Sequence, residues 1–188
     1  MYRKLYHLGG LIFPVILLVF SRRVAIYTCG LLFIIITTFD LFRLQWKELN
    51  LLVIRKLPIR LKKKEVKGMS GSPYFLGGCL LTLILFKPVS AIGGIICLSI
   101  GDMAAVTVGK TFGRIKIAGE KTLEGTSGFI FFTLLIMFAL KHFGVIGFPA
   151  VGMIAASVIS ACVELIPWKI DDNLTIPLTA ALVLNFFG

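Results

Sequence analysis

Acidic residues are the first candidates for chemistry in this 188-residue chain, because carboxylates can bind cations or accept protons. An ionisable residue in or beside an apolar segment is energetically costly, so its presence there indicates a functional site. Eight of the nine acids fall on or near one predicted face of the protein, and Glu164 lies just inside the same end of its segment. This one-sidedness predicts a single polar site. The nine acids are Asp40, Glu48, Glu65, Asp102, Glu120, Glu124, Glu164, Asp171 and Asp172.

The stretch 101–126 combines glycines, cations and carboxylates. Asp102 enters a helix of small residues on which Asp102, Ala105 and Gly109 share one face, so another backbone or a ligand could approach closely. Asp102 and Glu124 are hard oxygen ligands that could hold Mg²⁺. The cations suited to phosphate groups are Lys110, Arg114 and Lys121. Together these groups are what a nucleoside triphosphate requires of its site.

A structural interpretation of the same stretch stays open. Glycines can serve helix packing, and lysines and arginines can serve only to orient the chain in a membrane. Neither a Walker A loop nor the protein-kinase signature is present.

A second constellation precedes the last apolar segment, where Asp171, Asp172 and Asn173 follow one another. Two carboxylates and an amide could complete a divalent-metal site from the other side. Asp and Asn are also good helix N-caps, which is the structural alternative. Because one residue suffices to cap a helix, we favour the metal interpretation.

The start of the chain carries Arg3, Lys4 and His7, with Arg3 and His7 four residues apart on one helix face. Membrane orientation explains Arg3 and Lys4, whereas it does not explain His7, for which polar packing is the structural alternative. Asp40 and Arg43 are expected to form an interfacial ion pair rather than a catalytic dyad.

Composition decides the class of protein that must position these residues. Hydrophobic residues make up 57% of the chain, charged residues only 15%, and the mean hydropathy is +0.96, so we expect a membrane protein. The net charge of +11 suits anionic lipid, but the hydropathy excludes a nucleic-acid-binding module, which needs a water-soluble core. Four cysteines lie singly in apolar runs, which argues against disulfides or a zinc site.

The hydropathy pattern predicts an all-α, polytopic membrane bundle of about seven transmembrane helices in a single domain, residues 1–188. The second, fourth and sixth segments reach full spanning length, and the first is expected to be retained rather than cleaved. Sixteen of the 20 lysines and arginines fall on one side if the N-terminus is cytoplasmic, which predicts a cytoplasmic site and a C-terminus on the opposite side. The segments are approximately Leu5–Phe20, Val24–Phe42, Tyr74–Phe86, Pro88–Val108, Ser127–Leu140, Phe143–Ile166 and Leu174–Phe187.

The segment Leu44–Leu61 is too charged to span, yet Trp46, Leu49 and Val53 recur near helical spacing. An amphipathic helix at the cytoplasmic interface fits this pattern. The basic segment 43–67 is expected to meet anionic lipid headgroups.

The motifs resemble the CTP-dependent lipid alcohol kinases, a family that includes dolichol kinase, phytol kinase and the CTP-using diacylglycerol kinase. They occur in the family's order and extend from residue 3 to residue 177. Phosphatidate cytidylyltransferases are similar over the middle block, but they continue with a His-Gly-Gly segment that is absent after Gly125. The resemblance rests on Arg3–Lys4 with His7, Gly101–Asp102 through Phe112–Gly113–Arg114, Lys121–Gly125 and Asp172–Pro177.

The resemblance implies an integral-membrane kinase that transfers the γ-phosphoryl group of CTP to the hydroxyl of a polyprenol, dolichol, phytol-like prenol or diacylglycerol, with Mg²⁺ as cofactor. Its implied catalytic residues are Asp102, Asp172 and Lys121. Its implied metal ligands are Asp102, Glu124, Asp171 and Asp172. Its implied nucleotide contacts are Arg3, Lys4, His7, Lys110, Arg114, Lys121, Thr122, Glu124, Gly125 and Asn173.

Two other functions stay open at this point. A cytidylyltransferase-like enzyme would release pyrophosphate from CTP instead of CDP. A small transporter or channel should show polar groups at mid-membrane or on both sides, and an inverted repeat, and neither is apparent in the sequence.

Overall fold

The computed structural model describes residues 7–56, 66, 68–166 and 170–188 of the chain. Two predicted nucleotide contacts, Arg3 and Lys4, therefore lie outside the described residues, as does the basic run Lys62–Lys64. The fold is 81% helical, which confirms the expected class in its main part.

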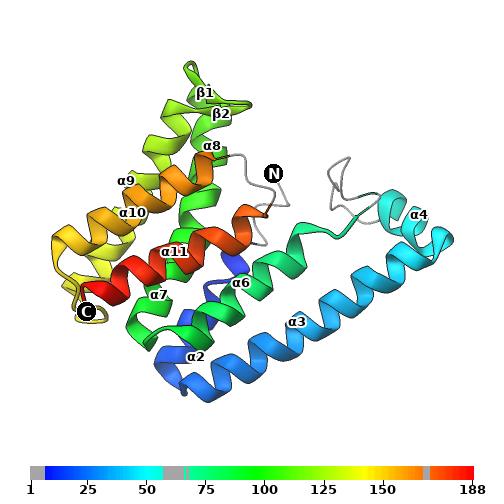
Figure 1. The fold of residues 1–188 in the computed structure, drawn as a ribbon, viewed down its shortest axis with the longest axis horizontal. Coiled ribbons are helices and arrows are strands. Elements are labelled where there is room, and N and C mark those ends of the chain that lie inside the picture. Colours follow the sequence, from blue (N-terminus) through cyan, green and yellow to red (C-terminus); the bar gives the residue numbers. More distant parts are fainter. Residues whose placement is uncertain (1–6, 57–65, 67, 167–169) are drawn as a thin grey trace.

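The helices follow the apolar segments, and a short hairpin interrupts them (Figure 1). In chain order the elements are α2 (Ile12–Val19), α3 (Arg22–Gln45), α4 (Lys47–Lys56), α6 (Gly71–Leu85), α7 (Pro88–Ile96), η1 (Cys97–Gly101), α8 (Asp102–Phe112), β1 (Lys116–Ala118), β2 (Lys121–Thr122), α9 (Leu123–His142), α10 (Ala150–Leu165) and α11 (Asp172–Phe186).

The antiparallel hairpin β1–β2 corrects the all-α prediction. Gly119 between the strands has a φ of +59°, a conformation that glycine adopts without steric cost, and it lets the chain reverse. The strands are too short for an alternating pattern to reveal them in the sequence. The hairpin matters because it carries Lys121 at the start of α9.

One long helix forms the centre of the fold. α7, η1 and α8 continue one another from Pro88 to Phe112, and 72% of the apolar stretch of this helix is buried. Pro88 suits the first helical position because its missing N–H would have no partner there. The π-helical turn η1 ends directly before Asp102. Such turns are rare and frequently mark functional sites.

The predicted close approach to the small-residue face of α8 is confirmed. A Cβ added at Gly109 would lie 2.9 Å from the Thr122 hydroxyl, and one at Gly125 would lie 2.7 Å from the Ala105 carbonyl oxygen. α8 and α9 therefore pack backbone to backbone. This packing explains Gly109 and Gly125 structurally, as the alternative interpretation allowed.

Three helices are long and apolar enough to cross a membrane: α3, the helix Pro88–Phe112, and α9. Together with the hydropathy they make the chain a membrane protein. Shorter apolar helices are His7–Val19, Gly71–Leu85 and Ala150–Leu165, so seven full spans are not shown. The prediction of one long span over Phe143–Ile166 was wrong, because α10 starts only at Ala150, after Gly144 in a positive-φ conformation and Pro149 at the N-cap.

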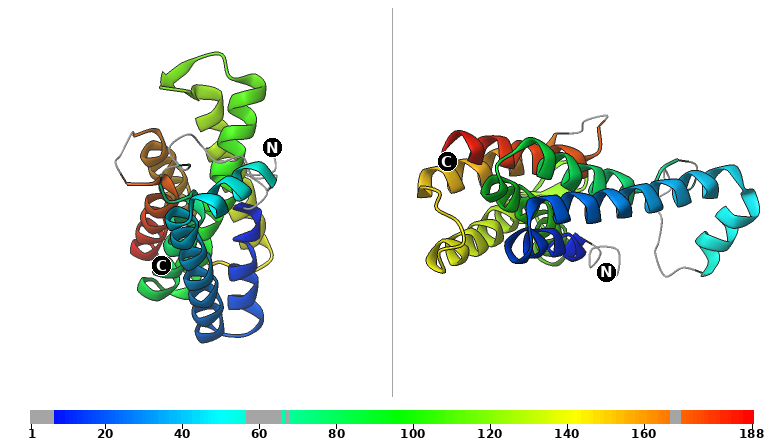
Figure 2. Two further views of the ribbon diagram at one scale, coloured as in Figure 1. Left: turned by 90° about the vertical axis from the view of Figure 1, so that its right-hand side faces the viewer. Right: turned by 90° about the horizontal axis from the view of Figure 1, so that it is seen from below.

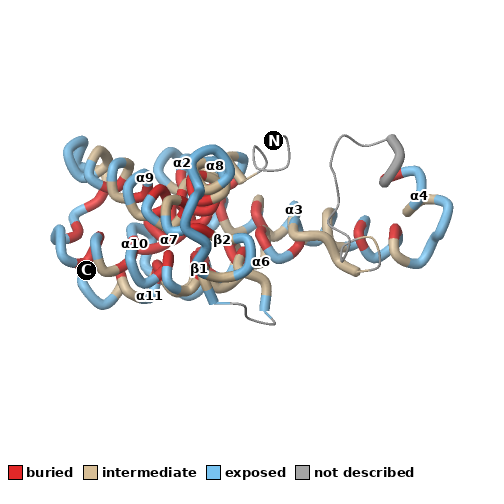
Figure 3. Tube along the Cα trace, turned by 90° about the horizontal axis from the view of Figure 1, so that it is seen from above, coloured by how far each residue is buried: buried red, intermediate tan, exposed pale blue. Residues whose placement is uncertain are grey.

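The buried residues concentrate around α7 and η1, whereas α3 is far more exposed (Figure 3). Only 17% of the apolar stretch of α3 is buried, and this helix packs against α2 and α6. The α4 helix follows the far end of α3 and projects from the rest of the bundle (Figure 2). The predicted amphipathic helix is thus present as Lys47–Lys56.

At the end of the bundle opposite to Asp102, cations bond to backbone carbonyls. Arg22 donates from Nε to Leu83 O at 2.9 Å and from Nη2 to Ile84 O at 2.7 Å, in the last turn of α6. The Nζ atoms of Lys87 and Lys141 each donate over 2.8 Å, to Gly188 O and Phe148 O respectively. Carbonyls in the last turn of a helix lack intrahelical donors, so Arg22 satisfies those of α6, whereas Lys87 and Lys141 bond to carbonyls outside the helices.

Candidate functional site

Three carboxylates from three helices converge at one end of the bundle. Asp102 is the first residue of α8, Glu164 lies in the last turn of α10, and Asp172 begins α11. One oxygen from each lies within 4.8 Å of the others. Asp102 and Glu164 are each only 5% exposed. Glu164 and Asp172 follow Asp102 by 62 and 70 positions in the sequence, and the fold brings all three together.

Lys121 bridges this group from the hairpin. Its Nζ lies 2.9 Å from Glu164 Oε1 and 3.8 Å from Asp172 Oδ2, and it also donates to the Glu164 backbone carbonyl. The Lys121 side chain keeps 33% of its surface exposed. The cation therefore stabilises clustered carboxylates while its outer side faces solvent or a ligand.

His7 joins the group from the N-terminal segment. His7 Nδ1 lies 3.2 Å from Asp102 Oδ2. The imidazole ring meets the Phe75 ring edge-on, with 4.8 Å between centroids, and the side chain is only 12% exposed. Both contacts hold the ring in place beside Asp102.

The three residues at the start of α11 divide two roles between them. Asp171 is the N-cap, and its Oδ1 accepts from the Asn173 backbone N at 3.2 Å and from Asn173 Nδ2 at 2.6 Å. Asp172 instead lies in the carboxylate group. The capping interpretation thus describes Asp171 and Asn173, and the metal interpretation fits Asp172.

The residues at the start of α9 also have local contacts. Thr122 is the N-cap, and its hydroxyl accepts from Gly125 N at 3.1 Å. The Glu124 carboxylate accepts from Ile115 N, with both oxygens at 3.3 Å. Among the described residues, the group that could hold a metal comprises neither Glu124 nor Asp171.

Lys110 lies in the last turn of α8, and Arg114 follows the end of this helix; both residues are exposed. At about 1.5 Å per residue, Lys110 stands about 12 Å from Asp102 along the helix axis. Both cations are open to a large polar ligand that would extend from the carboxylate group toward the hairpin.

Glu164 is the member of the group that the sequence-based assignment of site residues omits. Its signal is visible in the sequence as an acid near the end of the apolar run 150–166. A buried acid in such a run indicates function by default. The partners of Glu164 could not be read from the run itself.

The donor set fits Mg²⁺. Carboxylate oxygens are the ligands this ion prefers, and opposite oxygens of its octahedral shell lie about 4 Å apart. At least two of the three oxygen pairs would be adjacent in such a shell, about 3 Å apart, so the three oxygens, which lie within 4.8 Å of one another, would move closer together around a bound ion. A divalent ion and a lysine beside it would together suit a phosphate ester.

Comparison with known proteins identifies relatives of this chain. It is 27% identical over 179 residues to CTP-dependent diacylglycerol kinase 1 of Saccharomyces cerevisiae, covering 81% of this chain and 60% of that protein. An uncharacterized protein of Methanocaldococcus jannaschii is 34% identical over 68% of this chain and 64% of its own length. An uncharacterized protein of Rickettsia prowazekii is 32% identical over 98% of this chain and 93% of its own length.

The chain thus spans 60% of the length of the yeast kinase that it matches and nearly the full length of the Rickettsia relative. No protein-family model and no solved structure matches it. Three fungal relatives, each 25–27% identical to this chain, share the name CTP-dependent diacylglycerol kinase 1. The chain belongs to the family of CTP-dependent lipid kinases.

Proposed function

We propose that this chain is an integral-membrane kinase that transfers the γ-phosphoryl group of CTP to the hydroxyl of a lipid alcohol. The observation that carries the proposal is the group Asp102, Glu164 and Asp172, which lies with Lys121 at one end of an apolar bundle. The names of the fungal relatives favour diacylglycerol as the acceptor over dolichol, a polyprenol or phytol.

In this reaction the lipid hydroxyl oxygen bonds to the γ-phosphorus while the bond from that phosphorus to its bridging oxygen breaks, which leaves CDP. Phosphoryl transfer depends chiefly on positioning and on neutralising charge. Asp102, Glu164 and Asp172 would hold Mg²⁺, which when bound neutralises charge on the phosphate oxygens. Lys121 would turn its exposed side toward the same phosphates. The hydroxyl proton would pass to a carboxylate, with Asp102 and Asp172 as candidates.

The remaining predicted contacts extend the nucleotide site. Lys110 and Arg114 would meet the outer phosphates or the ribose side of CTP from the end of α8. Arg3 and Lys4, which lie outside the described residues, precede His7 by a few positions and would approach from the N-terminal segment.

The membrane orientation is part of the proposal. We place the N-terminus and the carboxylate group on the cytoplasmic side, where CTP is available, and the C-terminus on the opposite side. The asymmetric distribution of lysine and arginine supports this orientation. The basic segment 43–67 would then face the anionic headgroups of the cytoplasmic leaflet.

The test is a transfer assay with the full chain purified in detergent, using CTP labelled at either the γ- or the α-phosphate. A kinase transfers the γ-label to diacylglycerol, whereas a cytidylyltransferase transfers the α-label to phosphatidic acid. Dolichol and phytol in parallel reactions identify the acceptor, and ATP tests the donor. Transfer of the α-label, or no transfer from CTP to any alcohol, would refute the proposal.

A further inference from the structure

An apolar surface continues around the corner from α3 to α4. Phe39 and Phe42 on α3 are 45% and 47% exposed, and the Phe42 ring lies 5.8 Å from the ring of Trp46 at the corner. Beyond the corner, Leu49 and Leu52 follow Trp46 at intervals of three residues, which places them on one helix face. The exposed side of a membrane helix thus turns directly onto the apolar side of α4.

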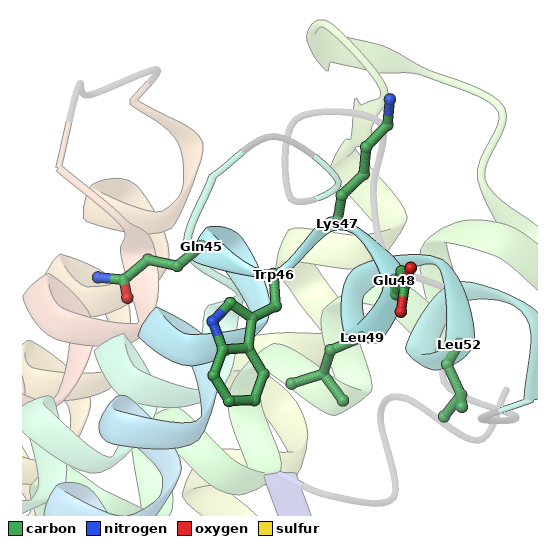
Figure 4. Close-up of a pocket in the computed structure, with 6 residues that line it drawn as sticks. All are labelled: Gln45, Trp46, Lys47, Glu48, Leu49 and Leu52. Atoms are coloured by element: carbon green, nitrogen blue, oxygen red, sulfur yellow. The ribbon is translucent and has the colours of Figure 1, made fainter.

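Trp46, Leu49 and Leu52, together with Gln45, Lys47 and Glu48, line a shallow pocket of about 560 Å³. Figure 4 shows Trp46, Leu49 and Leu52 pointing to one side of the chain and Lys47 pointing to the other. Trp46 is 62% exposed and Leu52 is 50% exposed. An exposed apolar face of this kind requires an apolar binding partner. The polar side chains on the opposite side of α4 indicate the chemistry of that partner.

The stretch of sequence that contains this face is strongly basic. Nine lysines and arginines lie between Arg43 and Lys67, against two acids, Glu48 and Glu65. Tryptophan and lysine at the end of a membrane helix are typical of the membrane–water interface. Apolar residues on one side with Lys47 on the other (Figure 4) match the two layers of an anionic leaflet, acyl chains below and headgroups above.

A buried polar network fixes α4 across the end of α3. Arg43, only 1% exposed, donates to Asp40 Oδ1 and to Asn50 Oδ1 on α4, both at 2.8 Å. It also donates to Gly68 O at 3.0 Å, and Asp40 Oδ2 accepts from Ser70 N at 2.6 Å. Removing one partner of a buried ion pair is strongly destabilising, so the angle between α3 and α4 is set by this network. The ion pair of Asp40 and Arg43, expected at the interface, is thus buried, and we call this network around Arg43 the clamp.

We infer that the α3–α4 corner is an in-plane membrane anchor that binds the surface of an anionic bilayer. Trp46, Leu49 and Leu52 enter the boundary of the acyl chains, Lys47 meets the headgroups, and the clamp around Arg43 holds α4 parallel to the membrane. The inference rests on the proposed orientation of this end of the bundle. Its test does not depend on kinase activity, so the two can fail separately.

The experiment follows Trp46 as the only tryptophan of the chain, after Trp168→Phe. The full-length protein is placed in phosphatidylcholine vesicles with or without phosphatidylglycerol, and the lipids carry bromine either near the glycerol or near the chain end. We expect blue-shifted emission that glycerol-proximal bromine quenches most, and stronger quenching when phosphatidylglycerol is present. Ile34→Trp, made in a Trp46→Phe and Trp168→Phe background, is the matched control and should respond most to chain-end bromine.

Two variants test the clamp and the charge. Asn50→Ala should reduce the quenching of Trp46 without changing that of the Ile34→Trp control. Lys47→Gln should lower the ratio of bound to unbound corner about fivefold in anionic vesicles, and far less in phosphatidylcholine alone.

Either of two results would overturn the inference. Red-shifted emission without quenching would mean that the corner faces water. Blue-shifted emission without quenching would mean that protein, such as a second copy of this chain, covers it instead of lipid.

Discussion

The two ends of the bundle use the same kind of residue for different purposes. At one end Lys121 contacts two carboxylates, and His7 contacts a third. At the other end Arg22, Lys87 and Lys141 donate to backbone carbonyls. The sequence offers these cations only as charges to be counted for orientation. In the structure, the cations at one end satisfy backbone carbonyls, and the cations at the other end lie beside carboxylates.

The carboxylate end should respond most strongly to substitution. Asp102→Asn, Glu164→Gln and Asp172→Asn keep side-chain size and each remove one negative oxygen ligand. Transfer from CTP to lipid should fall by more than about a hundredfold, since even the outer partners of metal ligands are typically worth 10- to 100-fold. Losses should be strongly non-additive between Asp102 and Asp172, because ligands of one ion act as a unit.

Asp171→Asn is the matched control for these carboxylate variants. It preserves the N-cap of α11, because Asn caps as well as Asp, and it lies outside the carboxylate group. Its transfer rate should stay near that of the unchanged protein. Rates are compared per folded molecule, because Glu164→Gln removes the buried partner of Lys121 and is expected to lower stability as well. Normal turnover of both Asp102→Asn and Asp172→Asn at the Mg²⁺ concentration used for the unchanged protein would refute the proposal of a shared metal site.

The exposed cations of the carboxylate end should have the next largest effect. Removing Lys110 or Arg114 by alanine deletes one charge-assisted phosphate contact, about 1.5–3 kcal/mol, which corresponds to a decrease in kcat/KM for CTP of about ten- to a hundredfold. Steady-state kinetics over a range of CTP concentrations measures it. Arg23→Leu at the opposite end removes the same charge and should change nothing. Unchanged kinetics in both alanine variants would restore the view that these residues only orient the chain.

Substitution of His7 should have an intermediate effect on transfer, and the size of the effect should depend on where the new side chain places its nitrogen. The amide nitrogen of Asn can occupy the position of Nδ1, the atom near Asp102, whereas that of Gln reaches toward the position of Nε2. His7→Gln should lower transfer about tenfold and raise the Mg²⁺ concentration needed for half-maximal rate, while His7→Asn should retain most of both. Equal losses in the two variants would show that the contact with Asp102 does not matter.

Arg22→Leu should leave catalysis almost unchanged and lower stability. Its two hydrogen bonds to the end of α6 are charge-assisted, and their loss is expected to cost about 1.5–3 kcal/mol of folding free energy. Unfolding in detergent measures this loss, and turnover per folded molecule should equal that of the unchanged protein. Reduced turnover with unchanged stability would show that Arg22 affects catalysis, and would contradict the purely structural role assigned to the cations at this end.

The sequence predicts this site in part because the cost of a buried charge is independent of the fold. Asp102 and Asp172 stand out by residue type alone, and the structure brings them together with Lys121 nearby. Glu164 could have been chosen by the same argument, but its distance of 62 residues from Asp102 is bridged only by tertiary packing. Asp171 and Asp172 are neighbours with different roles, and only the capping geometry of α11 separates them.

The fold is predictable to a similar extent. Hydropathy locates most helices, since burial in lipid dominates their composition. The loop before α10 is missed because residues 143–149 are apolar enough to join the neighbouring run, and the glycine conformation that breaks it is a backbone property. The hairpin carrying Lys121 is missed because two short strands leave no periodic trace.

Because the π-helical turn Cys97–Gly101 directly precedes Asp102, the number of residues in this turn determines the direction in which Asp102 points. Each residue advances an α-helix by about 100°, so deleting a single position there would turn Asp102 away from His7 although every side chain of the site were still present. The same deletion in an exposed loop would be absorbed. In this segment a deletion is therefore a more severe change than a substitution. Active relatives are expected to differ in the residue types of this segment but to keep its length.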